Sequence, residues 1–158
     1  MELKELTTAF AAKMGIDELT VEDGVCSMTI DDIPMDFTET PDGLAVVGVA
    51  VVGEPPPDKR EAFYEMLLQA NTQLYGTKGI ALGKSPDTGE IMLIGGLPFK
   101  GLELQEFCKD LDEFVSKAEE WRDTVENFRP AAEEAAVRDQ EAAQFTKFGA
   151  NGPGFMSV

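Results

Sequence analysis

The most informative pattern in the sequence is a run of apolar residues at helical spacing between Phe63 and Leu74. Phe63, Met66, Leu67, Ala70 and Leu74 recur every three or four positions and predict one buried stripe. A second apolar set lies beside this stripe and consists of Tyr64, Leu68 and Tyr75. A helix that packs on one sheet of its own chain needs only the first stripe. The second set therefore predicts a further surface to bury, such as a second copy of the chain.

Two more segments carry the helical period. Residues 2–14 place Leu3, Leu6, Phe10 and Met14 on one face, and Gly15 follows at a natural stopping position. The longest stripe begins after Glu103 and consists of Leu104, Phe107, Leu111, Phe114, Val115, Ala118, Trp121, Val125 and Phe128. It predicts a long amphipathic helix that ends before Pro130.

Alternating patterns predict five strands. Residues 25–30 and 33–38 alternate between apolar and polar side chains. Residues 44–52 are apolar on both faces of the predicted strand, so the core can cover one face and something else must cover the other. Residues 80–82 and 90–96 form a hairpin through a turn that contains Pro, Asp and Gly. The segment with Ile16, Leu19 and Val21 is interpreted as a link. The order helix, three strands, helix, two strands, helix predicts an α+β domain with a mainly antiparallel sheet and flanking helices.

The domain is expected to span residues 1–128, followed by an arm over 129–158. Residues 131–147 are rich in Ala, Glu and Gln and almost lack an apolar stripe, which is typical of a solvated helix or a partly disordered segment.

Composition excludes several function classes. The 13 Lys and Arg against 30 Asp and Glu give a net charge of -17, which disfavours a nucleic-acid partner. The chain has no histidine, and its glycines and acidic pairs form no phosphate loop or metal motif, so no catalytic residue, metal or cofactor is expected. Cys26 and Cys108 lie in periodic apolar segments and are expected to be buried free thiols. No signal peptide or membrane-spanning run is visible, so a cytosolic location without membrane insertion is expected.

The apolar residues of the first helix and early strands allow two interpretations. These residues are Leu3, Leu6, Phe10, Met28, Ile33, Met35 and Phe37. They form either part of the core or an adaptable groove for an extended peptide, because methionines repack around varied partners and a strand edge accepts another strand.

Short motifs between Leu67 and Pro98 resemble a known family. The residues are LLQAN at 67–71, GTKGIALG at 76–83, GEIML at 89–93 and Leu97-Pro98, with Trp121-Arg122 near the end of the long helix. In this set and in its order of elements, the chain resembles the type III secretion chaperones of the Tir chaperone (CesT-like) family over residues 1–128.

The resemblance implies a non-enzymatic homodimer that dimerises largely through the second helix and a neighbouring strand. It would bind the extended amino-terminal segment of a secreted effector and use no nucleotide. The implied dimer residues are Tyr64, Leu68 and Tyr75, and the implied effector-binding residues are Leu3, Leu6, Phe10, Met28, Ile33, Met35, Phe37, Val49 and Val51. For the arm, two roles stay open: shielding the apolar patch, or contacting the secretion apparatus.

Two other functions remain as alternatives at this point. One is a regulatory or adaptor domain of related fold that binds a folded partner. The other is a small-molecule sensor or enzyme that uses a pocket between sheet and helices.

Overall fold

The computed structural model describes residues 2–17, 19–74, 79–98 and 103–130, together with residues 133, 135, 136 and 138; at Leu74 only the backbone is described. The chain divides into two units, residues 1–127 and 128–158. Beyond Pro130, the four described residues of the second unit are helical. The rest of the predicted arm lies outside the described residues, so its conformation and the proposed domain boundary stay predictions.

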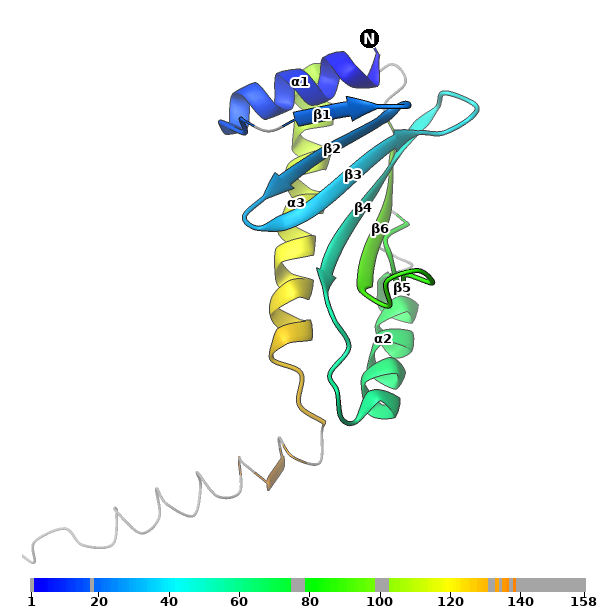
Figure 1. Cartoon of the computed structure of the whole chain (residues 1–158), viewed down its shortest axis with the longest axis vertical. Helices are drawn as coiled ribbons and strands as arrows, with labels where there is room; N and C mark the ends of the chain where they lie inside the picture. Colours follow the sequence, from blue (N-terminus) through cyan, green and yellow to red (C-terminus); the bar gives the residue numbers. More distant parts are fainter. Residues whose placement is uncertain are drawn as a thin grey trace, which may run out of the picture. The chain divides into compact units, whose positions relative to one another are not determined.

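The described residues of the first unit form a six-stranded sheet and three helices (Figure 1). Their order and bounds are α1 (Leu3–Met14), β1 (Leu19–Glu22), β2 (Val25–Ile30), β3 (Ile33–Glu39), β4 (Ala45–Gly53), α2 (Arg60–Leu74), β5 (Ala81–Lys84), β6 (Ile91–Pro98) and α3 (Leu104–Glu126). The strand order in space is β1-β2-β3-β4-β6-β5, and every neighbouring pair is antiparallel. The predicted fold class is confirmed.

One strand was not predicted. Strand β1 occupies part of the segment that was interpreted as a link, and it pairs with β2 from Leu19 opposite Met28 to Glu22 opposite Val25. The two-residue turn Asp23-Gly24 joins them, with φ of 48° and 81°, as the tightest hairpins require. Three of the four β1 residues are exposed, so the strand shows little of the alternation between buried and exposed positions that identifies strands in a sequence.

The core lies between one face of the sheet and helices α1 and α3, which contact the sheet and each other. We call this covered side the inner face; in the view of Figure 1, α3 runs behind the strands. On β4, Val46, Gly48, Ala50 and Val52 are buried on this face. Their alternation with half-buried residues explains why the sequence of this strand is apolar on both sides.

Phe114 of α3 occupies a hollow in the inner face. A Cβ atom added to Gly48 or Gly95 would lie 3.0–3.1 Å from the nearest Phe114 carbon, so the missing side chains make room for the ring. Phe37 meets Phe114 edge to face, with ring centroids 6.1 Å apart and an interplanar angle of 70°. This contact fixes the position of α3 against the centre of the sheet.

Local signals set the helix ends. The backbone N–H of Glu2 donates to the Glu5 carboxylate at 3.2 Å, and that of Glu103 donates to Glu106 at 3.3 Å, which satisfies backbone donors at the starts of α1 and α3. Helix α1 ends at Gly15, in the left-handed conformation with φ of 69°, as predicted.

Candidate partner-binding site

Most of the predicted effector-binding side chains lie in the core of the isolated chain. The buried ones, all 5% exposed or less, are Leu3, Leu6, Phe10, Met28, Ile33, Met35 and Phe37. In this state they stabilise the packing of α1 and the early strands and offer no surface to a partner. Their role in effector binding stays a prediction, and a charged residue at these positions is expected to disrupt the fold. Cys26 and Cys108 are buried and free, as predicted.

The other two predicted effector-binding residues, Val49 and Val51, lie on the opposite face of the sheet. Val49 is paired across the strands with Ile94, and Val51 with Met92. With Val47, these side chains are all half-buried and form what we call the outer apolar face: Val47, Val49, Val51, Met92 and Ile94. The nine predicted residues therefore do not form one patch, because seven lie in the core and two belong to this outer face.

The outer apolar face is bordered by polar residues on β3 and β2. Asp36 lies opposite Val49, and Thr38 lies opposite Val47. The Ser27 hydroxyl donates a hydrogen bond of 2.6 Å to the Asp36 carboxylate. An apolar strip with one carboxylate at its border is suited to an extended segment that has apolar and basic residues.

Helix α2 presents a second candidate surface. The Leu68 side chain is 69% exposed, whereas Phe63 and Leu67 on the same helix are buried. Tyr64 is half-buried; its ring centroid lies 5.8 Å from that of Phe63 and 5.7 Å from the Lys84 ammonium. The third residue of the predicted dimer set, Tyr75, lies outside the described residues.

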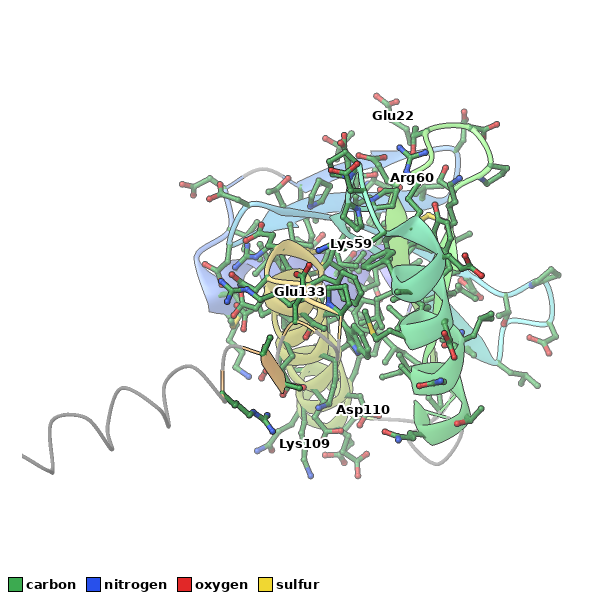
Figure 2. All side chains as sticks on the ribbon, turned by 90° about the horizontal axis from the view of Figure 1, so that it is seen from below. Glu22, Lys59, Arg60, Lys109, Asp110 and Glu133 are labelled. Atoms are coloured by element: carbon green, nitrogen blue, oxygen red, sulfur yellow. The ribbon has the colours of Figure 1, made fainter. Side chains whose placement is uncertain are left out.

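The two edges of the sheet differ in what lies beside them. At β5, the Asn71 amide of α2 donates to the Leu82 carbonyl at 3.0 Å and accepts from the Leu82 N–H at 2.7 Å. At β1, three of the four residues are exposed, and Glu22 projects into solvent (Figure 2). Asn71 belongs to the LLQAN motif, but the sequence assigned it no role, because its partner follows eleven residues later and depends on the fold.

A cluster of charged residues joins the β2–β3 turn to α3. Asp31 and Asp32, with positive φ, form the turn, and Arg122 donates a hydrogen bond to the Asp31 carbonyl. The pKa of Glu119 is raised, first by a hydrogen bond with the Asp31 side chain, then by partial burial and by repulsion from the Asp31 charge. No group of three potential metal ligands occurs among the residues that the structure describes.

Replacing Glu119 with Gln is expected to stabilise the chain slightly at about pH 7, by less than about 1 kcal/mol because the site is open to solvent. A carboxyl whose pKa is higher in the folded state contributes stability at low pH and loses that contribution as the pH rises through the raised pKa. The gain from Glu119→Gln should therefore shrink when urea unfolding is repeated at about pH 5.

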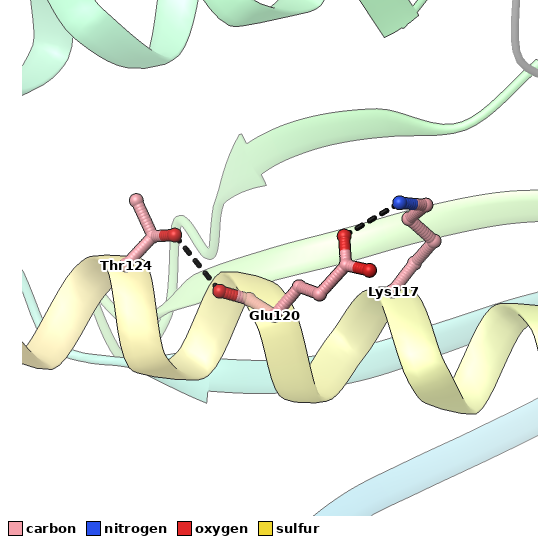
Figure 3. Close-up of polar contacts among 3 residues, drawn as sticks. All are labelled: Lys117, Glu120 and Thr124. Carbon is pink, nitrogen blue, oxygen red and sulfur yellow. Dashed lines mark hydrogen bonds and ion pairs between the residues drawn. The ribbon is translucent and has the colours of Figure 1, made fainter.

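Glu120 provides the control for this substitution. Its carboxylate accepts from the Lys117 ammonium at 2.5 Å, and its backbone carbonyl accepts from the Thr124 hydroxyl at 2.8 Å (Figure 3). Glu120→Gln also removes one acidic charge, but it weakens an attractive pair, so it should not stabilise the chain. Equal effects of the two substitutions would show that net charge, and not the Asp31 contact, sets the stability.

The chain is similar to known proteins in sequence and in fold. A sequence profile of the Tir chaperone protein (CesT) family matches residues 5–122. The match begins within α1 and ends near the end of α3. The chain belongs to this family. The resemblance to type III secretion chaperones is thereby confirmed, and the family and fold are those of non-enzymatic chaperones. No curated protein sequence matches the chain.

Several solved structures share the fold. The ExsC–ExsE complex matches with a TM-score of 0.64 and 18% identity, covering 84% of this chain and 99% of that chain. The HopA1–SchA chaperone–effector complex matches with a TM-score of 0.59 and 19% identity, covering 76% and 92%. The Yersinia pestis type III secretion chaperone SycH, in complex with a stable fragment of YscM2, matches with a TM-score of 0.52 and 19% identity. The match covers 72% of this chain and 94% of that chain. At these identities the likeness is one of fold.

Proposed function

We propose that this protein is a dimeric cytosolic chaperone that binds the extended amino-terminal segment of a type III secretion effector and keeps it soluble and competent for export. Family membership supports this function. The observation that carries the binding proposal is the outer apolar face, a strip of half-buried side chains on the sheet of a strongly acidic chain.

The form of the outer apolar face fits an extended segment better than a folded surface. Its side chains come from two adjacent antiparallel strands at alternate positions, so the apolar groups lie in a row. A peptide in extended conformation presents every second side chain to such a row. Asp36 at the border and the net charge of -17 favour a segment that also carries Lys or Arg.

The proposed binding role requires no catalytic group on the outer apolar face. The chain has no histidine, the commonest general base, and the outer apolar face itself carries no charged side chain. In the part of the chain that the structure describes, no helix is long and apolar enough to cross a membrane. We infer a binding role without cofactor, exerted in the cytosol.

Replacing Val49 with Asp is expected to weaken client binding at least tenfold. The new carboxylate would face Ile94 at the centre of the outer apolar face and would lose hydration when a client covers it. The client would first be captured with the tagged chaperone from its native cells and identified. Its purified amino-terminal segment would then be titrated by calorimetry.

Thr29→Asp is the matched control, because Thr29 is exposed on β2 and lies outside the outer apolar face. It adds the same charge and should leave the affinity within about twofold. Equal affinities for Val49→Asp and the wild type would remove this face from the client site. Loss of the dimer in Val49→Asp would assign the face to subunit contact. A client bound as a compact, protease-resistant domain would favour the adaptor function.

A further inference from the structure

The outward-facing backbone groups of β5 can be assigned from its pairing with β6. The Ser85 N–H donates to the Glu90 carbonyl at 2.8 Å, so this pair is hydrogen-bonded at the end of the hairpin. Antiparallel pairs alternate between hydrogen-bonded and non-hydrogen-bonded. Lys84 and Leu82, opposite Ile91 and Leu93, therefore direct their N–H and C=O groups away from β6. An unprotected edge of this kind accepts a strand from another chain.

Helix α2 meets the outward groups of Leu82. The Asn71 amide makes both hydrogen bonds that a neighbouring strand would make to Leu82, one as donor and one as acceptor. Two helical turns earlier, the Tyr64 ring receives the Lys84 ammonium at 5.7 Å. Figure 1 shows α2 beside β5. The outward backbone groups of Leu82 are thus bonded to α2, while Lys84 contacts the same helix through its side chain only.

At the opposite edge helix α1 contacts β1, but among the described residues no side chain hydrogen-bonds to the outward backbone of this strand as Asn71 does at β5. The two-residue turn Asp23-Gly24 makes Glu22 and Val25 the closing hydrogen-bonded pair, so Val21 directs its N–H and C=O away from β2. Val21 is 37% exposed. Among the described residues, no strand pairs with the outer side of β1.

We propose that Asn71 closes the β5 edge by holding α2 against it, so that strand addition to this sheet is confined to β1. This deepens the proposed function, because it names the edge at which an extended client segment pairs. The part that concerns Asn71 depends on this chain alone and is tested without a client, so its failure is separate from a failure of the chaperone function.

The test compares Asn71→Ala with Gln69→Ala in the full-length protein. Gln69 is an exposed amide on the same helix whose side chain donates to Glu65, so its loss leaves β5 covered. For Asn71→Ala, we expect the Leu82 amide to exchange with deuterium at least tenfold faster and sedimentation to show assemblies larger than the wild type. Gln69→Ala should match the wild type in both measurements.

A second substitution separates edge opening from general instability. Adding Lys84→Pro to Asn71→Ala removes an outward N–H without removing a bond to β6, so it should restore the wild-type size while the Leu82 amide still exchanges fast. If Asn71→Ala unfolds, Asn71→Asp keeps the side-chain size and the acceptor for the Leu82 N–H, loses the donor to the Leu82 carbonyl, and should give the same change in size.

Three results would overturn the proposal. The first is a wild-type size for the folded Asn71 variants, which would leave Asn71 as a local structural residue. The second is that Gln69→Ala forms assemblies as large as those of Asn71→Ala. The third is association that Lys84→Pro does not reverse, since this would place the contact elsewhere.

Discussion

Replacing Phe114 with Ala is expected to lower the free energy of unfolding by about 3–5 kcal/mol, the usual loss when a fully packed phenylalanine is truncated. Phe114 is 1% exposed and is held between the Phe37 ring and the hollow at Gly48 and Gly95. Neither glycine has a side chain that could move into the vacated space, so the cavity should remain largely open. Urea unfolding followed by circular dichroism measures the loss.

Leu104→Ala is the control, because Leu104 is on the same helix and is 36% exposed. Leu104→Ala should lower the free energy of unfolding by less than about 1 kcal/mol, since less apolar surface is removed from the interior. A loss of this small size for Phe114→Ala would mean that α3 does not pack on the sheet as described. Client binding of the folded Phe114→Ala protein should be unchanged, because the ring lies on the inner face and the proposed client site lies on the outer one.

The sequence was a good guide to the fold because most elements carry a clear period. Helix α3 and strand β3 are examples: α3 buries positions at helical spacing, and β3 buries every second residue. Strand β1 was missed because it is short and mostly exposed. Asp23-Gly24 is a clear turn signal, but a turn alone does not show that the residues before it form a strand, which here depends on pairing with β2.

The candidate site was harder to predict for a different reason. An apolar period shows that a side chain needs burial, but not whether its own chain or a partner provides it. Phe10 and Met35 are buried by their own chain, whereas Val49 lies on the opposite face of the sheet. The pairing of Asn71 with Leu82 could not be predicted either, because polar contacts between distant segments depend on the register of the strands and the position of the helix.

Replacing Leu68 with Glu is expected to dissociate the proposed homodimer, weakening the dimer at least about 100-fold. Leu68 is 69% exposed in the isolated chain and lies on the exposed side of α2, next in the sequence to the buried Leu67. In a twofold dimer, residues near the axis meet their own copies, so each substitution brings two carboxylates close together. The apolar contact would be replaced by repulsion between like charges in a chain whose net charge is already -17.

Gln73→Glu is the matched control, because it adds the same charge at an exposed position of the same helix, about 140° around the helix from Leu68. Sedimentation of the wild type and both variants across a range of concentrations gives the dissociation constants. We expect dimers for the wild type and Gln73→Glu and monomers for Leu68→Glu, with the same unfolding transition per chain. A wild-type protein that stays monomeric at micromolar concentration would exclude the dimer. A dimer that tolerates Leu68→Glu would move the interface away from α2 and make the outer apolar face the next candidate for it.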